Sequence, residues 1–239
     1  MLPLEDIRNL PLPDLAMKLL ATLRREQVNF NNLVQGFRNQ GGYGAPQPPD
    51  LDALLERLSD AWAWLEAHAL IGPSSSNPGG KSWQRLTALG EEAAQDPAAA
   101  AKVWAGERLA GELHPALSSA KTNFALGDYE TASFAAMKAV EVEVRRVAEQ
   151  ANELLGVALM RKAFSPKGGV LVDADAEGGE QQAMADLFAG AIGAYKNPAS
   201  HRTVRFEDPM EAAEVIQLAD LLLRIVGRAE RRRNSQAVS

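Results

Sequence analysis

Apolar residues recur at helical spacing through the second half of the chain, where strand-like alternation is nearly absent. One broad apolar stripe contains Tyr129, Ala136, Met137, Val140, Val144, Val147, Ala148 and Ala151. After Asp208, a second apolar face contains Val215, Ile216, Ala219, Leu222, Leu223 and Val226. The pattern also predicts helices from His114 to about Leu126 and from about Glu180 to Tyr195, with a polar loop after the first stripe. We therefore predict a helical bundle in this half.

Residues at the ends of these segments support the same helices. Gly127 and Asp128 are suited to end one helix and to cap the next. Asp208 as N-cap, Pro209 at the first helical position and Glu211 as the capping-box acid mark the start of the final helix. The basic run RAERRR near its end complements the negative pole of the helix dipole.

The first part of the chain has a different organisation, with two loop-forming clusters, QGGYGAPQPPD and GPSSSNPGG. Asp14 is expected to cap one helix, a weak helix covers about Asn31 to Arg38, and Asp50 opens a third. The apolar face of the third helix contains Leu51, Leu54, Leu55, Leu58, Trp62 and Leu65. A short hairpin around the glycine-rich tip follows. This order resembles a winged helix-turn-helix domain over about residues 10–95.

The chain is therefore expected to be mostly α-helical and to consist of four consecutive segments. A winged-helix-like domain covers residues 1–95, and a linker helix covers 96–111. A helical bundle covers 112–232, and residues 233–239 are expected to form a disordered tail.

Composition narrows the classes of function. The 239 residues include no cysteine, which excludes a thiol nucleophile and a thiolate metal site. The start, MLPLED, is too acidic for a signal peptide, and no apolar run approaches the roughly 18 residues that cross a bilayer. We expect a cytoplasmic protein with no membrane contact, no metal and no cofactor. The net charge of −6 argues against coating nucleic acid by bulk charge, but not against a local basic site.

Charge in the winged-helix-like segment does not favour DNA. Residues 1–96 carry eight basic and twelve acidic side chains. The stretch Ser59–Leu70, where a recognition helix is expected, contains Asp60 and Glu66 but no Lys or Arg. DNA-reading elements carry basic side chains toward bases and phosphates. We expect this segment to contact a protein or to dimerise, with DNA binding as the less favoured alternative.

The segment YKNPASHR, residues 195–202, combines residues that can perform chemistry. Pro198 disfavours helix at Asn197, so a helix is expected to end near Lys196. That cation and His201, beyond a tight turn, can converge on one anion. Histidine titrates at about pH 6.5, so it can remove the proton of an RNA 2′-hydroxyl or protonate the leaving 5′-oxygen. The cation would stabilise the phosphoryl charge, and the product would be a 2′,3′-cyclic phosphate.

A purely structural interpretation of this segment stays open. Lys196 is favourable at a helix C-terminus through the helix dipole alone. Asn197 and Pro198 form an ordinary turn, and His201 could hydrogen-bond a carbonyl group. Spacing alone does not separate the two interpretations.

A family resemblance rests on GGEQQAMADLFAGAIGAYKNPASHR, on the preceding stretch AAMKAVEVEVRRV and on the capped final helix. Together they resemble the HEPN superfamily over about residues 112–230, and more closely its Ymh- or abortive-infection-like group of conserved hypothetical proteins. The resemblance implies an all-α bundle that forms a homodimer. It also implies, as in many members, a metal-independent endoribonuclease of antiphage or toxin–antitoxin systems, with RNA as substrate.

The HEPN motif places an Arg, a polar residue and a His within a short span. Lys196, Asn197 and His201 stand at these positions and are the expected catalytic residues. Ser200 and Arg202 are expected to support them. Lysine keeps the charge of arginine but not its bidentate fork. Three outcomes therefore stay open: weaker activity, substitution by Arg202, or RNA binding without cleavage.

Further residues are assigned around this expected site. Glu141 could orient His201 across the bundle, or form an edge ion pair with Lys138 or Arg145. The basic residues expected to bind the substrate are Arg161, Lys162, Lys167, Arg202 and Arg205. The small residues expected to allow approach of a second copy are Ala189, Gly190 and Gly193. The acidic loop that starts at Asp173 resembles an EF-hand loop, but Met184 stands where the bidentate Glu is required, so no calcium site is expected.

Two functions from different classes remain. The leading hypothesis is a HEPN-type endoribonuclease of a defence or toxin-like system, whose first domain contacts a protein partner or antitoxin. The alternative is a non-catalytic winged-helix/HEPN regulator that binds nucleic acid or protein.

Overall fold

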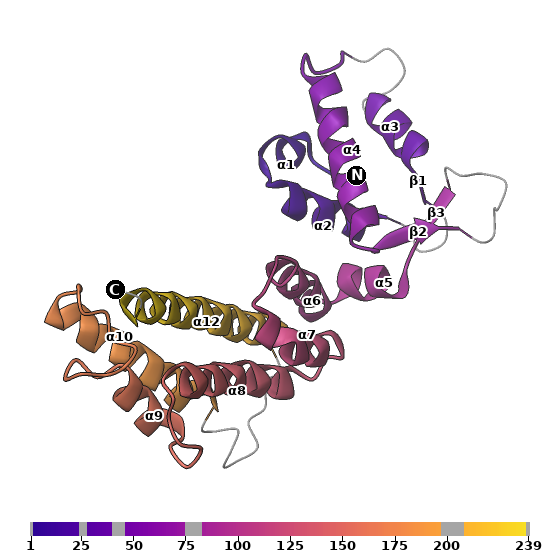
Figure 1. Ribbon diagram of the computed structural model, residues 1–239. Coiled ribbons are helices and arrows are strands. Elements are labelled where there is room, and N and C mark those ends of the chain that lie inside the picture. Colours follow the sequence, from indigo (N-terminus) through magenta and orange to yellow (C-terminus); the bar gives the residue numbers. More distant parts are fainter. Residues whose placement is uncertain (1, 24–27, 40–45, 75–82, 197–207, 238–239) are drawn as a thin grey trace. The chain divides into compact units, whose positions relative to one another are not determined.

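The computed structural model describes residues 2–23, 28–39, 46–74, 83–196 and 208–237, most of them in helices (Figure 1). The chain divides into two compact units, Met1–Val103 and Trp104–Ser239. The division falls inside α6 (Pro97–Arg108), within the segment where a linker helix is predicted. Among the described residues, no helix combines the length and the apolar character needed to cross a membrane.

The amino-terminal unit combines short helices with a small sheet. Its helices are α1 (Leu4–Asn9), α2 (Leu12–Thr22), α3 (Phe30–Arg38), α4 (Leu51–Ala67) and α5 (Ala88–Gln95). Its strands are β1 (Val28–Asn29), β2 (Ile71–Pro73) and β3 (Trp83–Leu86). The strands pair antiparallel in the order β1-β3-β2. The hairpin and the helix beginning near Asn31 are confirmed.

The core of this unit forms where α4 buries the apolar face that its sequence predicts. Leu54, Leu58 and Leu65 of α4 are buried against α2 and the sheet. The start of α5 lies directly against the residue before β2, because a Cβ on Gly90 would stand only 1.9 Å from the carbonyl oxygen of Leu70. Only glycine permits this approach.

Of the two expected helix starts in this unit, the one at Asp50 is confirmed in position and the cap at Asp14 is wrong. Asp14 is not an N-cap: α2 already begins at Leu12 and carries a proline in its first turn, so Asp14 lies inside that turn. Asp50 precedes α4 but makes no capping bond, because its two oxygens accept bonds of 2.7 and 2.9 Å from Arg8. Helix α1, which contains Arg8, was not predicted either.

The carboxyl-terminal unit is a helical bundle. Its elements are the 3₁₀ turn η1 (Pro115–Leu117), α7 (Ser118–Ala125), α8 (Tyr129–Val147), α9 (Gly156–Ala163), α10 (Gly178–Ala191), the π-helical segment η2 (Ile192–Lys196) and α12 (Pro209–Ala237). The helices α8 and α12 lie side by side and form its centre (Figure 1). The predicted faces of both helices are buried against each other, except that Tyr129 is partly exposed and Ala151 lies beyond the end of α8.

Helix ends in this unit follow the local signals. Gly127 takes a φ of 79°, and Asp128 caps α8 by accepting a bond of 3.0 Å from the backbone N–H of Thr131. Asp208 accepts a bond of 2.8 Å from the N–H of Met210 at the start of α12. Helix α9 is a correction, because its residues were assigned to a polar loop. Its eight residues, about two turns, are too few for a clear periodic signal.

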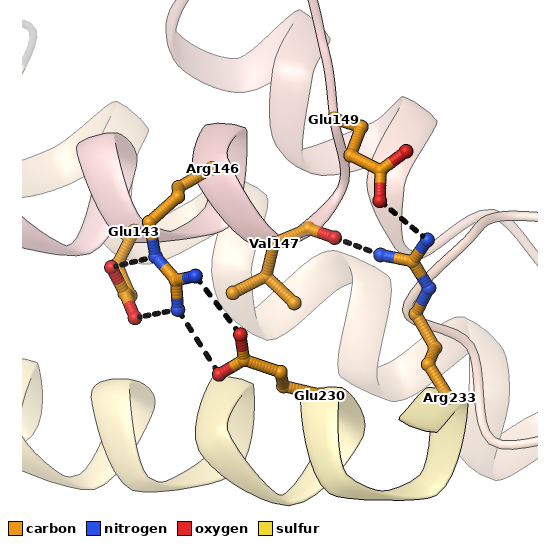
Figure 2. Close-up of polar contacts among 6 residues, drawn as sticks. All are labelled: Glu143, Arg146, Val147, Glu149, Glu230 and Arg233. Carbon is orange, nitrogen blue, oxygen red and sulfur yellow. Dashed lines mark hydrogen bonds and ion pairs between the residues drawn. The ribbon is translucent and has the colours of Figure 1, made fainter. Parts of the chain in front are cut away.

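The carboxyl-terminal parts of α8 and α12 are joined by charged side chains (Figure 2). Arg146 binds Glu143 on its own helix and Glu230 on α12, at 2.7 and 2.9 Å. Arg233 donates to the carbonyl oxygen of Val147 and pairs with Glu149 at 3.1 Å. These contacts attach α12 to the end of α8 as far as Arg233, and the helix continues to Ala237, whereas a disordered tail was expected from residue 233.

Candidate functional site

Glu141 of α8 is a buried carboxylate at the centre of a polar cluster. The residue is 4% exposed. Its Oε1 accepts a hydrogen bond of 2.8 Å from Nη2 of Arg145. Its Oε2 accepts a bond of 2.9 Å from the backbone N–H of Gly156 and lies 3.3 Å from Nζ of Lys196. We call these four residues, Glu141, Arg145, Gly156 and Lys196, the Glu141 cluster.

Three separate elements bring the cluster together. Arg145 stands one turn after Glu141 on α8, and its Nε also donates to the carbonyl oxygen of Leu154 at 3.4 Å. Gly156 is the first residue of α9 and has a φ of 59°, a conformation that glycine adopts without strain. Its N–H therefore points toward Glu141 at a turn that other residues would adopt only at a cost.

Lys196 reaches the cluster from η2. This π-helical segment continues α10 up to Lys196, and π segments are frequent at functional sites. An added Cβ on Gly193 would be in contact with Val157 of α9 at 3.4 Å, so the two elements lie close together. The side chain of Lys196 is only 16% exposed. The cation at the helix end is thus directed into the unit.

The cluster keeps its carboxylate charged. Burial by itself would raise the pKa of Glu141, but the Gly156 N–H, the Arg145 guanidinium and the Lys196 ammonium outweigh it and hold that pKa below its ordinary value. Two cations, Arg145 and Lys196, then share this carboxylate in a half-enclosed setting. Such an arrangement can hold a lysine in place.

The structure unites two residues that sequence reasoning assigned to the site, Glu141 and Lys196. Of the two edge partners considered for Glu141, it pairs with Arg145, while Lys138 is exposed and makes no described ion pair with it. The role of Glu141 toward His201 stays a prediction. The other assigned residues of this segment lie outside the described residues: Asn197, Ser200, His201, Arg202 and Arg205.

The basic residues of α9 and of the loop after it make no polar contact with the Glu141 cluster among the described residues. Arg161 pairs with Asp186 of α10 at 3.2 Å, and both side chains are more than half exposed. Lys162 and Lys167 are exposed. No described hydrogen bond or ion pair joins these three residues to the Glu141 cluster. Their role in substrate binding stays a prediction.

Sequence reasoning missed Gly156 and considered Arg145 only as an edge partner. The i to i+4 spacing of Glu141 and Arg145 was a usable signal, but their burial was not visible in it. Glu141 stands at the border of the apolar stripe in the helical projection, yet in the structure it is enclosed by α9 and η2. The Gly156 donor could not be identified, because α9 itself was not predicted.

The small residues assigned to a dimer face are distributed differently. Ala189 is buried in the core, and Gly193 faces Val157 within the unit. Gly190 is exposed, with open space where a Cβ would stand. Ala189 and Gly193 therefore serve packing within the chain, which corrects the face proposed for a second copy. The homodimer stays a prediction, and light scattering at micromolar concentration tests it.

The acidic loop that resembles an EF-hand is held by contacts within the chain. Asp173, in the loop that resembles an EF-hand, pairs with Arg232 at 3.2 Å and accepts a bond from the N–H of Asp175. Within the described ranges, no three His, Asp or Glu side chains gather in a way that could hold a metal ion.

Residues 112–226 match the model of a family described as "Protein of unknown function (Hypoth_ymh)". This range contains the whole Glu141 cluster and supports the predicted resemblance to the Ymh-like group in the carboxyl-terminal half. No curated protein and no solved structure is significantly similar to the chain. The family description carries no activity, so function has to be argued from the site.

Proposed function

We propose that the carboxyl-terminal unit is a HEPN-type, metal-independent endoribonuclease. The observation that carries this proposal is the position of Lys196: a cation held by the buried Glu141 at the end of η2, immediately before the segment that contains His201. The match of residues 112–226 to the Ymh family model supports it, because the proposed HEPN resemblance covers the same range. The all-helical architecture of the unit is compatible with it.

In the proposed reaction, His201 removes the proton of an RNA 2′-hydroxyl, and the resulting oxygen attacks the adjacent phosphorus. The bond from phosphorus to the 5′-oxygen breaks, and that oxygen takes a proton from an acid, which leaves a 2′,3′-cyclic phosphate and a 5′-hydroxyl. Lys196 stabilises the charge that develops on the phosphoryl oxygens. Asn197, Ser200 and Arg202 are proposed to support the turn and the phosphate.

The Glu141 cluster has a positioning role in this proposal. Glu141 shares its carboxylate between Arg145 and Lys196, so it fixes the position of the ammonium. A guanidinium is therefore present within the same cluster, although the motif carries lysine where HEPN proteins carry arginine. Arg145 is 14% exposed and already bonded, so we assign it to positioning rather than to direct phosphate binding.

Cleavage of a mixed RNA substrate in excess EDTA tests the proposal. His201→Ala is expected to lose about 10²-fold or more, the usual effect of removing a positioned acid–base group. Lys196→Ala is expected to fall comparably, and Lys196→Arg is expected to retain or raise activity. Lys138→Ala is the matched control, since it removes an exposed lysine of α8 outside the cluster. A folded His201→Ala variant that cleaves at the wild-type rate would contradict the mechanism.

The defence or toxin-like role can be tested in cells. Induced expression of the wild-type chain is expected to slow growth, whereas His201→Ala is expected to be tolerated at the same protein level. His68→Ala, which changes a histidine stacked on Trp64 in the other unit, serves as a control. Equal growth with the wild type and with His201→Ala would remove the support for toxicity by cleavage.

One observation favours a second function, a non-catalytic regulator. The ammonium of Lys196 already has a carboxylate partner in Glu141, so the cation can serve the fold without serving catalysis. RNA that binds with a salt-dependent affinity but is not cut, even by Lys196→Arg, would favour this alternative. Cleavage by the wild type would exclude it.

For the amino-terminal unit we propose a winged helix-turn-helix module that contacts protein rather than DNA. The order α2, β1, α3, α4, β2, β3 and the sheet order β1-β3-β2 support the fold. Several described cations of the unit are engaged within it: Arg8 by Asp50, Lys18 by Asp6, and Arg57 by backbone carbonyl oxygens of Ile7 and Leu10. Tight, steeply salt-dependent binding of the full chain to duplex DNA would contradict this assignment.

A further inference from the structure

A cavity of about 470 Å³ lies in the carboxyl-terminal unit. Three parts of the chain line it: the loop that follows α9, helix α10 and helix α12. The cavity shares no residue with the Glu141 cluster. Its volume falls within the roughly 300–1,000 Å³ that small-molecule sites occupy. The unit therefore has a concave site that the proposed ribonuclease reaction does not use.

Apolar side chains form most of the wall. Phe164 is stacked on Phe188 at a ring distance of 4.0 Å and belongs to the core. Leu187 of α10 also lines the cavity and is 41% exposed. Ile225 of α12 adds a further apolar surface. Binding of an apolar ligand would be favourable here, because it would remove these apolar side chains from contact with water.

The loop side of the cavity is held in place before any ligand binds. The N–H of Leu171 donates to the carbonyl oxygen of Ala163 at 2.8 Å. Gln181 donates to the carbonyl oxygens of Asp173 and Ala176, both at 2.9 Å. A Cβ on Gly169 would stand 2.3 Å from the backbone nitrogen of Ser165, so the loop closes tightly there. A preformed wall lowers the entropy cost of binding.

The charged side chains on the rim of the cavity differ in whether they have a partner. Arg232 pairs with Asp173, and Glu180 accepts the N–H of Glu177 in the capping box of α10. Arg228 also lines the cavity, and within the described part of the chain its guanidinium makes no hydrogen bond or ion pair. The rim thus presents one cation without a partner beside two acids that already have one.

We propose that this cavity binds a small amphipathic carboxylate, with its apolar chain against Phe164, Leu187 and Ile225 and its head group on Arg228. A guanidinium and a carboxylate match in geometry and can form two parallel hydrogen bonds. A singly charged head suits one unpartnered cation. Asp173 and Glu180 on the same rim repel a doubly charged phosphate about twice as strongly as a singly charged carboxylate.

Calorimetric titration of the full chain with octanoate, and separately with 1-octanol, tests the proposal. The two probes share the apolar chain and differ in the charged head. Arg228→Gln is expected to weaken octanoate binding about tenfold, the usual effect of losing hydrogen bonds to a charged group, and to leave 1-octanol unchanged. Leu187→Trp places a larger side chain in the cavity and is expected to weaken both probes.

Arg231→Gln is the matched control, because Arg231 is an exposed arginine of the same helix that does not line the cavity. It is expected to leave octanoate binding unchanged. Thermal melts of the three variants check that each is folded. The proposal is overturned if the wild type releases no binding heat with millimolar octanoate, if Arg228→Gln and Arg231→Gln weaken octanoate equally, or if Leu187→Trp leaves both probes unaffected.

Discussion

Helix α8 carries two clusters of carboxylates and guanidinium groups that are nearly adjacent in sequence and differ in exposure. In the Glu141 cluster, the Glu141 and Arg145 side chains are 6% and 14% exposed. In the second cluster, Arg146 lies beside Glu143 and Glu230 and is 53% exposed (Figure 2). The hydrogen-bond distances are alike, 2.8 Å in the first and 2.7 Å between Arg146 and Glu143 in the second.

The comparison shows that equal geometry does not mean equal energy. In the exposed cluster, water and salt replace a lost partner, so each pair contributes little. In the buried cluster, removal of one member leaves charges that are largely shielded from water. An apolar set of side chains would pack there at no such cost, and retention of charges in a buried place fits a functional role. Substitutions in the two clusters therefore should differ in their cost to stability.

Glu141→Ala is expected to lower the free energy of unfolding of the carboxyl-terminal unit by about 3–5 kcal/mol. It leaves Arg145, Lys196 and the Gly156 N–H without their shared acceptor. Urea denaturation of the full chain, followed by circular dichroism, measures the loss. Glu143→Ala is the control on the same helix and should cost much less. Equal losses for the two variants would show that the buried cluster has no special weight.

Acidic pH is expected to remove the contribution of Glu141 to the stability of the unit. The pKa of Glu141 lies below its ordinary value of 4.5, so its contribution to stability is complete above that pH and is lost as the pH falls through the lower folded-state pKa. The stability difference between the wild type and Glu141→Gln should therefore shrink in acid. Urea titrations of both proteins between neutral pH and about pH 3 measure it. A difference that is constant or grows in acid would contradict the assignment.

Gly156→Ala is expected to cost about 1–2 kcal/mol, because the left-handed φ of 59° is unfavourable for a residue with a Cβ. The change also strains the turn that directs the N–H toward Glu141. Gly178→Ala is the matched control. Gly178 is the first residue of α10 as Gly156 is of α9, but its φ is not positive, and the space around it is open. Similar melting temperatures for the two variants would show that the turn tolerates a Cβ.

Arg146→Ala is expected to cost only about 0.2–1 kcal/mol, since its pairs are exposed. The bond from Arg146 holds the pKa of Glu143 below its ordinary value, so this contribution has the same sign of pH dependence as that of Glu141. Salt distinguishes the two clusters. Molar NaCl should abolish most of the stability loss caused by Arg146→Ala and little of the loss caused by Glu141→Ala. Insensitivity of both to salt would contradict the distinction.

The helices could be predicted where their signals are local. Asp128 caps α8 and Asp208 caps α12 as their positions indicate, and the apolar face of α12 is buried as its periodicity requires. Asp14 was misassigned because proline lets α2 begin earlier, and α9 was missed because its sequence is short. The extent of α12 depends on Arg233, whose partners lie on another element.

Local sequence signals were enough to identify the residue types that can perform chemistry and most of the helices that present them, since propensity, caps and periodicity act over a few residues. Tertiary structure alone decided that residues 141, 156 and 196 meet, because their separation along the chain carries no local signal. Tertiary structure also decided which charges are buried. Glu141 and Glu143 are similar in their sequence setting. Glu141 is a buried carboxylate because α9 and η2 pack on its side of α8. The energy of a charge depends on the water around it, and that water is removed by the fold.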